Sequence, residues 1–107
     1  MSRGTMSAAL LDAVAARFRV LAEPARLRIL DRLRHGPMHV NALADATGLQ
    51  QANLSRHLQT LHACGLVERS RTGTFIHYGI ADPQVFALCD LVCGQVDKAA
   101  RLRRRAS

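Results

Sequence analysis

The three cysteines of this chain, Cys64, Cys89 and Cys93, are the residues best suited to bind a soft metal ion. Cys89 and Cys93 are four residues apart, so on a helix their side chains share a face. Three thiolates suit arsenite, cadmium or lead better than hard cations. Two other interpretations stay open. The cysteines are inert core residues, since cysteine is often buried as a small hydrophobe, or they sense oxidants or persulfides.

The five histidines offer a second set of metal ligands, since nickel, cobalt and zinc accept imidazole nitrogen. His35 and His39 flank a Gly-Pro pair, and His62 precedes Cys64 by two residues. Only His35 and His39 have the four-residue spacing of a ligand pair, and the helix pattern breaks between them. A nickel or cobalt site built on histidines is therefore an alternative to the cysteines, and a chain that binds no metal is another.

Polar side chains of a different kind occupy residues 51–63, between apolar residues at helical spacing. A helix there buries Leu54, Leu58 and Leu61 and turns the residues between them outward. Arginine and glutamine form paired hydrogen bonds to the edges of guanine and adenine in the major groove of DNA. The predicted DNA contacts of this helix are Gln51, Asn53, Ser55, Arg56 and His57. His57 lies beside a buried leucine, which suits a phosphate or interhelical contact better than a base contact.

The segments on either side of this helix complete a helix-turn-helix followed by a wing. Val40, Leu43 and Ala44 have helical spacing, Gly48 interrupts the pattern, and the leucines of 54–61 restart it. We therefore place a helix-turn-helix at 40–63. Residues 66–80 have strand character on both sides of a glycine turn, which predicts the wing. Its predicted phosphate contacts are Arg69, Arg71, Thr74 and His77.

Amphipathic helices are predicted at both ends of the chain, at about 7–21 and 83–102. Each has an apolar stripe, and together the stripes exceed what the core of so short a chain needs. The basic end, 101–107, is either an arm that seeks phosphate or a solvated helix end whose cations suit the helix dipole. The predicted fold is mainly α with a small β-hairpin (α+β), in the order α-α-α-α-β-β-α, with 1–107 as one domain.

Composition narrows the class of protein. The chain has 107 residues, a formal net charge of +7 and a sequence pI of about 11.0, which together suggest a polyanionic partner. Apolar residues make up 49% of the chain, enough for a packed core. No apolar run is long enough to cross a bilayer and no secretory signal opens the chain. We therefore expect a cytoplasmic protein without a membrane partner, whose cysteines stay reduced.

Four motifs together resemble the ArsR/SmtB (arsenic-repressor) family of bacterial winged-helix repressors. The resemblance covers roughly residues 15 to 82. Its strongest part is the combination of the E-P-x-R-L-x-I-L pattern with the helix that ends in H-L-x-x-L-x-x-x-G-L-V. The motifs are LAEPARLRILDRL at 21–33, ALADATGL at 42–49, NLSRHLQTLHACGLV at 53–67 and RTGTFIHYGI at 71–80.

The resemblance implies a homodimer, joined through its first and last helices, that binds an imperfect inverted repeat in double-stranded DNA. A metal ion or a thiol oxidant would release it. Cys64 coincides with a cysteine of the cadmium- and lead-sensing branch, whereas the second cysteine of that branch falls on Thr60. The family's C-x-C site falls on 39–41, which reads His-Val-Asn, and of its interfacial zinc site only Asp82 matches. The resemblance thus supports repression more strongly than any particular inducer.

We predict a sequence-specific transcriptional repressor that a metal, metalloid or thiol-reactive inducer releases from DNA. The alternative is a repressor of the same family without a cysteine sensor, which responds to nickel or cobalt through histidines or to an accessory protein. An enzyme is not expected, because Cys64 and His62 on one helix turn cannot form a nucleophile and base pair in a cleft. A winged helix that binds only proteins would not need the cationic line of Arg56, Arg69 and Arg71.

Overall fold

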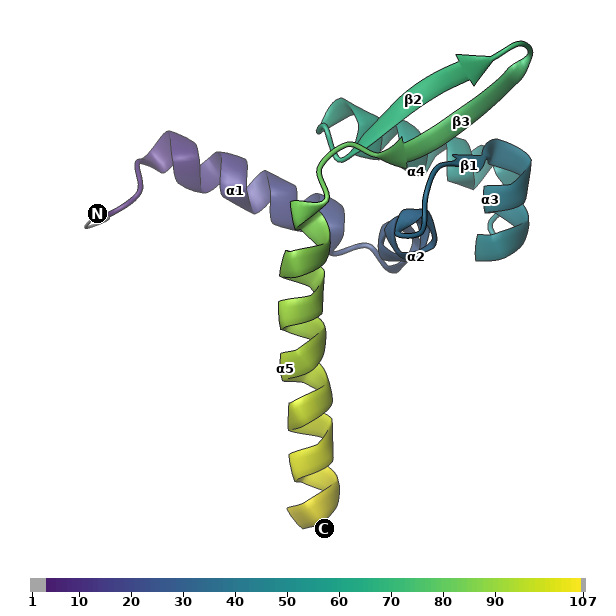
Figure 1. The fold of residues 1–107 in the computed structure, drawn as a ribbon. Helices are drawn as coiled ribbons and strands as arrows, with labels where there is room; N and C mark the ends of the chain where they lie inside the picture. The colour runs from purple at the N-terminus through teal and green to yellow at the C-terminus, as the bar shows by residue number, and fades with distance from the viewer. Residues whose placement is uncertain (1–3, 107) are drawn as a thin grey trace.

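The computed structural model describes residues 4–106, which form five helices and three short strands (Figure 1). In chain order the elements are α1 (Ala8–Leu21), α2 (Pro24–Leu33), β1 (Met38–His39), α3 (Val40–Thr47), α4 (Gln51–Ala63), β2 (Val67–Thr72), β3 (Phe75–Ile80) and α5 (Gln84–Ala106). The prediction of a mainly helical, winged helix-turn-helix fold is therefore confirmed.

The predicted element order omitted strand β1, and this part of the prediction is wrong. The sheet has three strands in the order β1-β3-β2, and β1 pairs antiparallel with β3 through Met38 opposite Tyr78 and His39 opposite His77. A strand of two residues is too short to produce an alternating pattern, so the sequence contains no signal for it. It exists because the chain leaving α2 reaches the free edge of β3.

Local sequence explains where the main elements begin and end. The Ser7 hydroxyl accepts a hydrogen bond from the Leu10 backbone N–H at 3.1 Å, which caps α1. Pro24 opens α2, a position where its missing N–H costs nothing. Gly48 ends α3 with φ of +74°, and Gly73 opens the two-residue turn between β2 and β3 with φ of +62°. Both angles lie in the left-handed region that favours glycine.

The core is formed mainly by leucines of α2, α3 and α4 beneath the sheet. Seven large side chains are at most 1% exposed, and burying each one contributes about 1.5–3 kcal/mol. They are Ile29, Leu30, Leu33, Leu43, Leu54, Leu58 and Leu61. Because three of them lie on α4, the orientation of that helix about its own axis is fixed by the core.

Helices α1 and α5 extend away from this core, as Figure 1 shows. The Cα radius of gyration is 16.6 Å, whereas a compact domain of this length has about 13 Å. Each of the two helices has a single buried residue, Leu21 on α1 and Val85 on α5. Large apolar side chains on both remain exposed, at Leu10, Leu11, Phe18, Leu91, Val92, Val96 and Leu102.

The basic end of the chain continues α5, which runs to Ala106. Residues 1–3 and 107 lie outside the described residues, so the predicted domain 1–107 is described from 4 to 106, and the predicted tail 101–107 from 101 to 106. Within this range no helix is both long enough and apolar enough to cross a membrane.

Candidate nucleic-acid interface

The turn between α3 and α4 is fixed by hydrogen bonds on both sides. The Thr47 hydroxyl donates to the Leu43 carbonyl at 2.7 Å, and Arg28 of α2 donates to the Thr47 carbonyl at 3.2 Å. At the other side, the Gln51 side-chain amide donates to Asn41 Oδ1 at 2.6 Å, which joins the first turns of the two helices. Helix α4 is therefore held at a defined angle to α3.

The faces of α4 separate as the sequence predicts. Leu54, Leu58 and Leu61 are 0–1% exposed. Four of the predicted contact residues are exposed: Asn53, Ser55 and Arg56 lie away from the leucine face, and Gln51 is exposed as the first residue of the helix. An exposed polar face on a helix whose opposite face is fixed in the core is the geometry that places a recognition helix in the major groove.

Arg56 is positioned by its neighbour on the preceding helical turn. Its guanidinium donates to Asn53 Oδ1 at 2.6 Å. An arginine uses two N–H groups to bind the O6 and N7 atoms of guanine. Because the guanidinium has five N–H donors, the bond to Asn53 leaves enough of them for such a contact.

His57 has a different environment from the other predicted contacts on α4. It is partly buried, and its Nδ1 accepts a hydrogen bond from Arg26 Nε at 3.2 Å, while Arg26 also donates to the Val20 carbonyl at 3.3 Å. Burial lowers the pKa of His57, and the nearby positive charge of Arg26 lowers it further. The interhelical contact expected as one option is thus present, and the imidazole is kept neutral.

The four predicted wing contacts lie on different sides of the hairpin. Arg69 is opposite Tyr78 and Arg71 is opposite Ile76, so both arginines share a face with the buried Tyr78 but extend beyond the core and are exposed. Thr74 is exposed in the turn. His77 points to the other face of the sheet, because strand residues alternate. The structure therefore keeps the arginines together and separates His77 from them.

His77 lies beside His39 of β1, which the sequence did not indicate. The two ring centroids are 5.7 Å apart, and the His39 ring meets Phe75 edge to face at 4.9 Å. His39 also caps α3, because its Nδ1 accepts a hydrogen bond from the Asn41 backbone N–H at 3.1 Å. This cluster connects the wing to the start of the helix-turn-helix.

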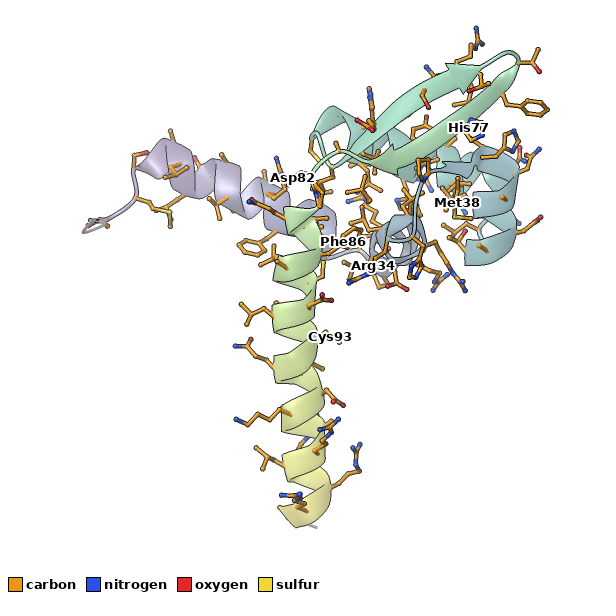
Figure 2. All side chains as sticks on the ribbon, viewed as in Figure 1. Arg34, Met38, His77, Asp82, Phe86 and Cys93 are labelled. Atoms are coloured by element: carbon orange, nitrogen blue, oxygen red, sulfur yellow. The ribbon has the colours of Figure 1, made fainter. Side chains whose placement is uncertain are left out.

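The three cysteines occupy three different environments. Cys64 is partly buried at the end of α4, where its thiol donates to the Leu61 carbonyl at 3.4 Å. Cys89 is partly buried on α5, and Cys93 is exposed further along that helix, as Figure 2 shows. Burial raises the pKa of Cys89, although the charge of Arg34 opposes the shift. Within residues 4–106 no three His, Cys, Asp or Glu side chains gather closely enough to hold a metal ion.

Arg34 fastens α5 to the rest of the molecule, a contact that sequence reasoning missed. Its guanidinium donates to both carboxylate oxygens of Asp90, at 2.8 and 3.1 Å, and lies 4.5 Å from the centre of the Phe86 ring (Figure 2). The hydrogen bond raises the pKa of Arg34 and lowers that of Asp90. No local pattern reveals the contact, because Arg34 and Asp90 are 56 residues apart.

A core-fixed α4 with an exposed polar face, followed by a hairpin with two exposed arginines, defines a winged helix-turn-helix domain of the DNA-binding class. The sequence pattern of the group described as "Bacterial regulatory protein, arsR family" matches residues 23–69. A "Probable mercury resistance operon repressor" of Streptomyces lividans is 36% identical over 92 residues, which are 85% of this chain and 74% of that protein. This chain belongs to the ArsR family, and the predicted resemblance is confirmed.

Other relatives agree with this assignment. The "HTH-type transcriptional regulator NmtR" of Mycobacterium tuberculosis is 43% identical over 77 residues, 72% of this chain, and this chain spans 64% of its length. The solved homodimeric winged helix-turn-helix DNA-binding domain of Mb0332 from Mycobacterium bovis matches with a TM-score of 0.77 and 42% identity. That match covers 92% of this chain and 91% of the other. These relatives are named as regulators of transcription and not as enzymes.

Proposed function

We propose that this protein is a transcriptional repressor that binds an inverted-repeat operator as a homodimer. The observation that carries the proposal is the division of α4 into a face 0–1% exposed at Leu54, Leu58 and Leu61 and an exposed face that includes Asn53, Ser55 and Arg56. A helix that is polar on one side and fixed in the core on the other can enter the major groove without rearrangement.

The contacts are divided between base reading and backbone binding. Gln51 and Arg56 read base edges, and Ser55 and Asn53 add hydrogen bonds to a base or a phosphate. Arg69, Arg71 and Thr74 bind phosphate, which adds affinity and salt dependence but little sequence information. His57 is neutral and bound to Arg26, so it offers DNA only its outward N–H.

The proposed homodimer is supported by the uncovered apolar faces of α1 and α5. Phe18, Leu91 and Val96 are 52%, 64% and 61% exposed, and a second copy of the chain would cover such residues. The Mb0332 domain, which matches over nearly its whole length, is homodimeric. Two copies related by a two-fold axis present two α4 helices, which suits an operator with two half-sites.

For the inducer, we propose a thiophilic metal or metalloid such as As(III), cadmium or lead, bound by Cys64, Cys89 and Cys93. The mercury repressor from Streptomyces lividans is a relative whose name ties it to a soft metal. Because Cys64 does not form a group of three ligands with Cys89 and Cys93 within residues 4–106, the proposal requires ligands from two chains or a shift of α5. An inducer that binds one dimer geometry more tightly than the DNA-binding geometry weakens the affinity for DNA. The coupling free energy between the two sites is typically about 1–3 kcal/mol.

The second candidate is a repressor that responds to nickel or cobalt through histidines. One specific observation favours it, the side-by-side placement of His39 and His77. An accessory protein as the source of the signal is the third possibility. Partial burial raises the pKa of Cys89, which argues against oxidant sensing by this thiol.

DNA binding is tested by fluorescence anisotropy with promoter DNA from beside the gene, at several salt concentrations. Arg71→Gln should reduce the slope of log affinity against log salt by about 1, and Arg56→Ala should weaken operator binding more than binding to unrelated DNA. A protein that binds operator and unrelated DNA equally would contradict the proposal.

The inducer is tested by adding arsenite, cadmium or nickel to the reduced protein–DNA complex. Release by arsenite or cadmium that is lost in Cys89→Ser supports the thiolate proposal. Unchanged release in a variant with all three cysteines replaced by serine contradicts it. Release by nickel alone would assign sensing to the histidines.

A further inference from the structure

His39 and His77 are separated by 37 residues in the chain but form a directly opposed pair in the sheet. They are register partners across the β1–β3 ladder, so their side chains leave the same face. Both rings are partly exposed. Figure 2 shows His77 on β3, above the strand that carries His39.

The separation of the two rings is close to that of two imidazoles bound to one metal ion. At a metal–nitrogen distance of about 2.1 Å, a ring centroid lies about 3.2 Å from the ion, so octahedral and tetrahedral ligand angles of about 90° and 109° place two centroids about 4.5 and 5.2 Å apart. The observed distance is 5.7 Å, with an angle of 73° between the ring planes. The rings must therefore approach each other by about 0.5–1.2 Å to bind one ion, a small movement for two partly exposed side chains on neighbouring strands.

We propose that His39 and His77 bind one divalent transition-metal ion of the class that prefers imidazole, such as nickel, zinc or copper. Water molecules would complete the coordination, because no third protein ligand gathers with them within residues 4–106. A site with two protein ligands exchanges its ion readily, which suits the detection of a free ion better than a structural role. Neither ligand belongs to the set of three cysteines.

Metal binding at this site competes with the cap of α3. A neutral imidazole has one proton, and His39 Nδ1 has none while it accepts from the Asn41 backbone N–H. If the ion binds Nε2, the ring proton moves to Nδ1, which then cannot accept that hydrogen bond. If the ion binds Nδ1, the bond is lost directly. The neutral ring thus either caps α3 or binds the metal.

The lost cap lies next to the contact that joins α3 to the reading helix. Asn41 is the residue whose backbone N–H is capped, and its side chain accepts the 2.6 Å hydrogen bond from Gln51, the first residue of α4. An ion on His39 and His77 therefore loosens the start of α3 and, through Asn41, the start of α4. This consequence rests on the proposed function, whereas the metal site itself does not.

The site is tested by titrating the reduced, full-length protein with Ni²⁺ and recording backbone amide NMR spectra. Ni²⁺ is paramagnetic, so it should broaden the amides near the ion, at 38–41 and 76–78, before those of α5. His77→Gln should weaken this binding by about tenfold or more, since even the loss of an outer-shell partner has such an effect. The matched control, His35→Gln, removes an exposed histidine that precedes β1 and should change nothing. Equal binding by His77→Gln and wild type, or broadening confined to other residues, overturns the proposal.

The effect on DNA is measured separately, as the ratio of operator affinities with and without Ni²⁺ for each variant. Wild type and His35→Gln should lose about fivefold or more, whereas His77→Gln should lose nothing relative to its own metal-free affinity. If the protein binds Ni²⁺ but no DNA, the proposed function fails and the metal site stands. If the protein binds DNA but Ni²⁺ lowers the operator affinity of His77→Gln as much as that of wild type, the inference fails and the proposed repressor function stands.

Discussion

Leu58 of α4 and Leu91 of α5 are both leucines in the middle of a helix, but the first is 1% exposed and the second 64%. The same contrast separates two regions of the molecule. Helices α2 to α4 and the sheet cover their apolar residues with one another, whereas α1 and α5 leave most of theirs uncovered. One chain is therefore sufficient to build the body formed by α2 to α4 and the sheet, whereas the terminal helices have apolar faces that the proposed second chain would cover.

The largest expected effect comes from shortening one buried side chain in the body formed by α2 to α4 and the sheet. Leu58→Ala removes a fully buried side chain between α4 and the core, so the free energy of unfolding should fall by about 2–5 kcal/mol. Urea denaturation followed by circular dichroism measures this loss. The matched variant Leu91→Ala should lose far less in dilute protein, and its loss should grow with protein concentration. Equal losses at every concentration would contradict the division into two regions.

The second prediction concerns the terminal helices. Val96→Glu places a carboxylate on the apolar face of α5, which should weaken the homodimer by at least about 2 kcal/mol and leave the body folded. Sedimentation velocity measures the dimer and circular dichroism the fold. Ala87→Glu is the control, because Ala87 is exposed and lies nine residues, about two and a half turns, before Val96 on the opposite side. A Val96→Glu protein that stays dimeric would place the interface elsewhere.

The third prediction compares how the removal of one arginine affects operator binding in each of the two regions. Arg56→Ala should weaken operator binding by about 1–3 kcal/mol, because Arg56 is on the exposed face of α4. Arg101→Ala should change it little, since the end of α5 lies far from α4 and the wing in Figure 1. Fluorescence anisotropy titrations with operator DNA measure the affinity of both variants. A large loss in Arg101→Ala would support the phosphate-seeking arm.

The smallest expected effect is a change in how the free energy of unfolding depends on pH, caused by His57 of α4. The folded pKa of His57 lies below the usual 6.5, so the unfolded chain takes up a proton first and stability falls as pH decreases through about 6.5. His57→Gln keeps an acceptor for Arg26 but cannot be protonated, so its unfolding free energy should fall less between pH 7.5 and 5.5. Chemical denaturation at several pH values measures the slope. A slope identical to wild type would assign the dependence to other groups.

The helix-turn-helix was predictable because its signals are local. The spacing of Leu54, Leu58 and Leu61 defines the buried face of α4, and Gly48 supplies the left-handed residue that ends α3. The exposed contacts of α4 follow from the same spacing. Strand β1 was not predictable, because Met38–His39 is a strand only through its pairing with β3.

The remaining contacts of the site depend on residues that are distant in sequence. The Arg26–His57 hydrogen bond spans 31 residues and the Arg34–Asp90 pair spans 56. Each changes the interpretation of a predicted residue: burial and then Arg26 lower the pKa of His57, and Arg34 opposes the rise that burial causes in the pKa of Cys89. Spacing along the chain carries no information about such pairs.

The sequence by itself determined the class of fold and the exposed polar face of α4, because periodic burial and turn glycines act over a few residues. It also determined the basic character of the protein. Only the tertiary structure decided that the three cysteines do not come together as one group of ligands within residues 4–106 and that His39 meets His77. The physical reason is that ligand geometry depends on distances in space, and those follow from how the sheet and α5 pack on the core.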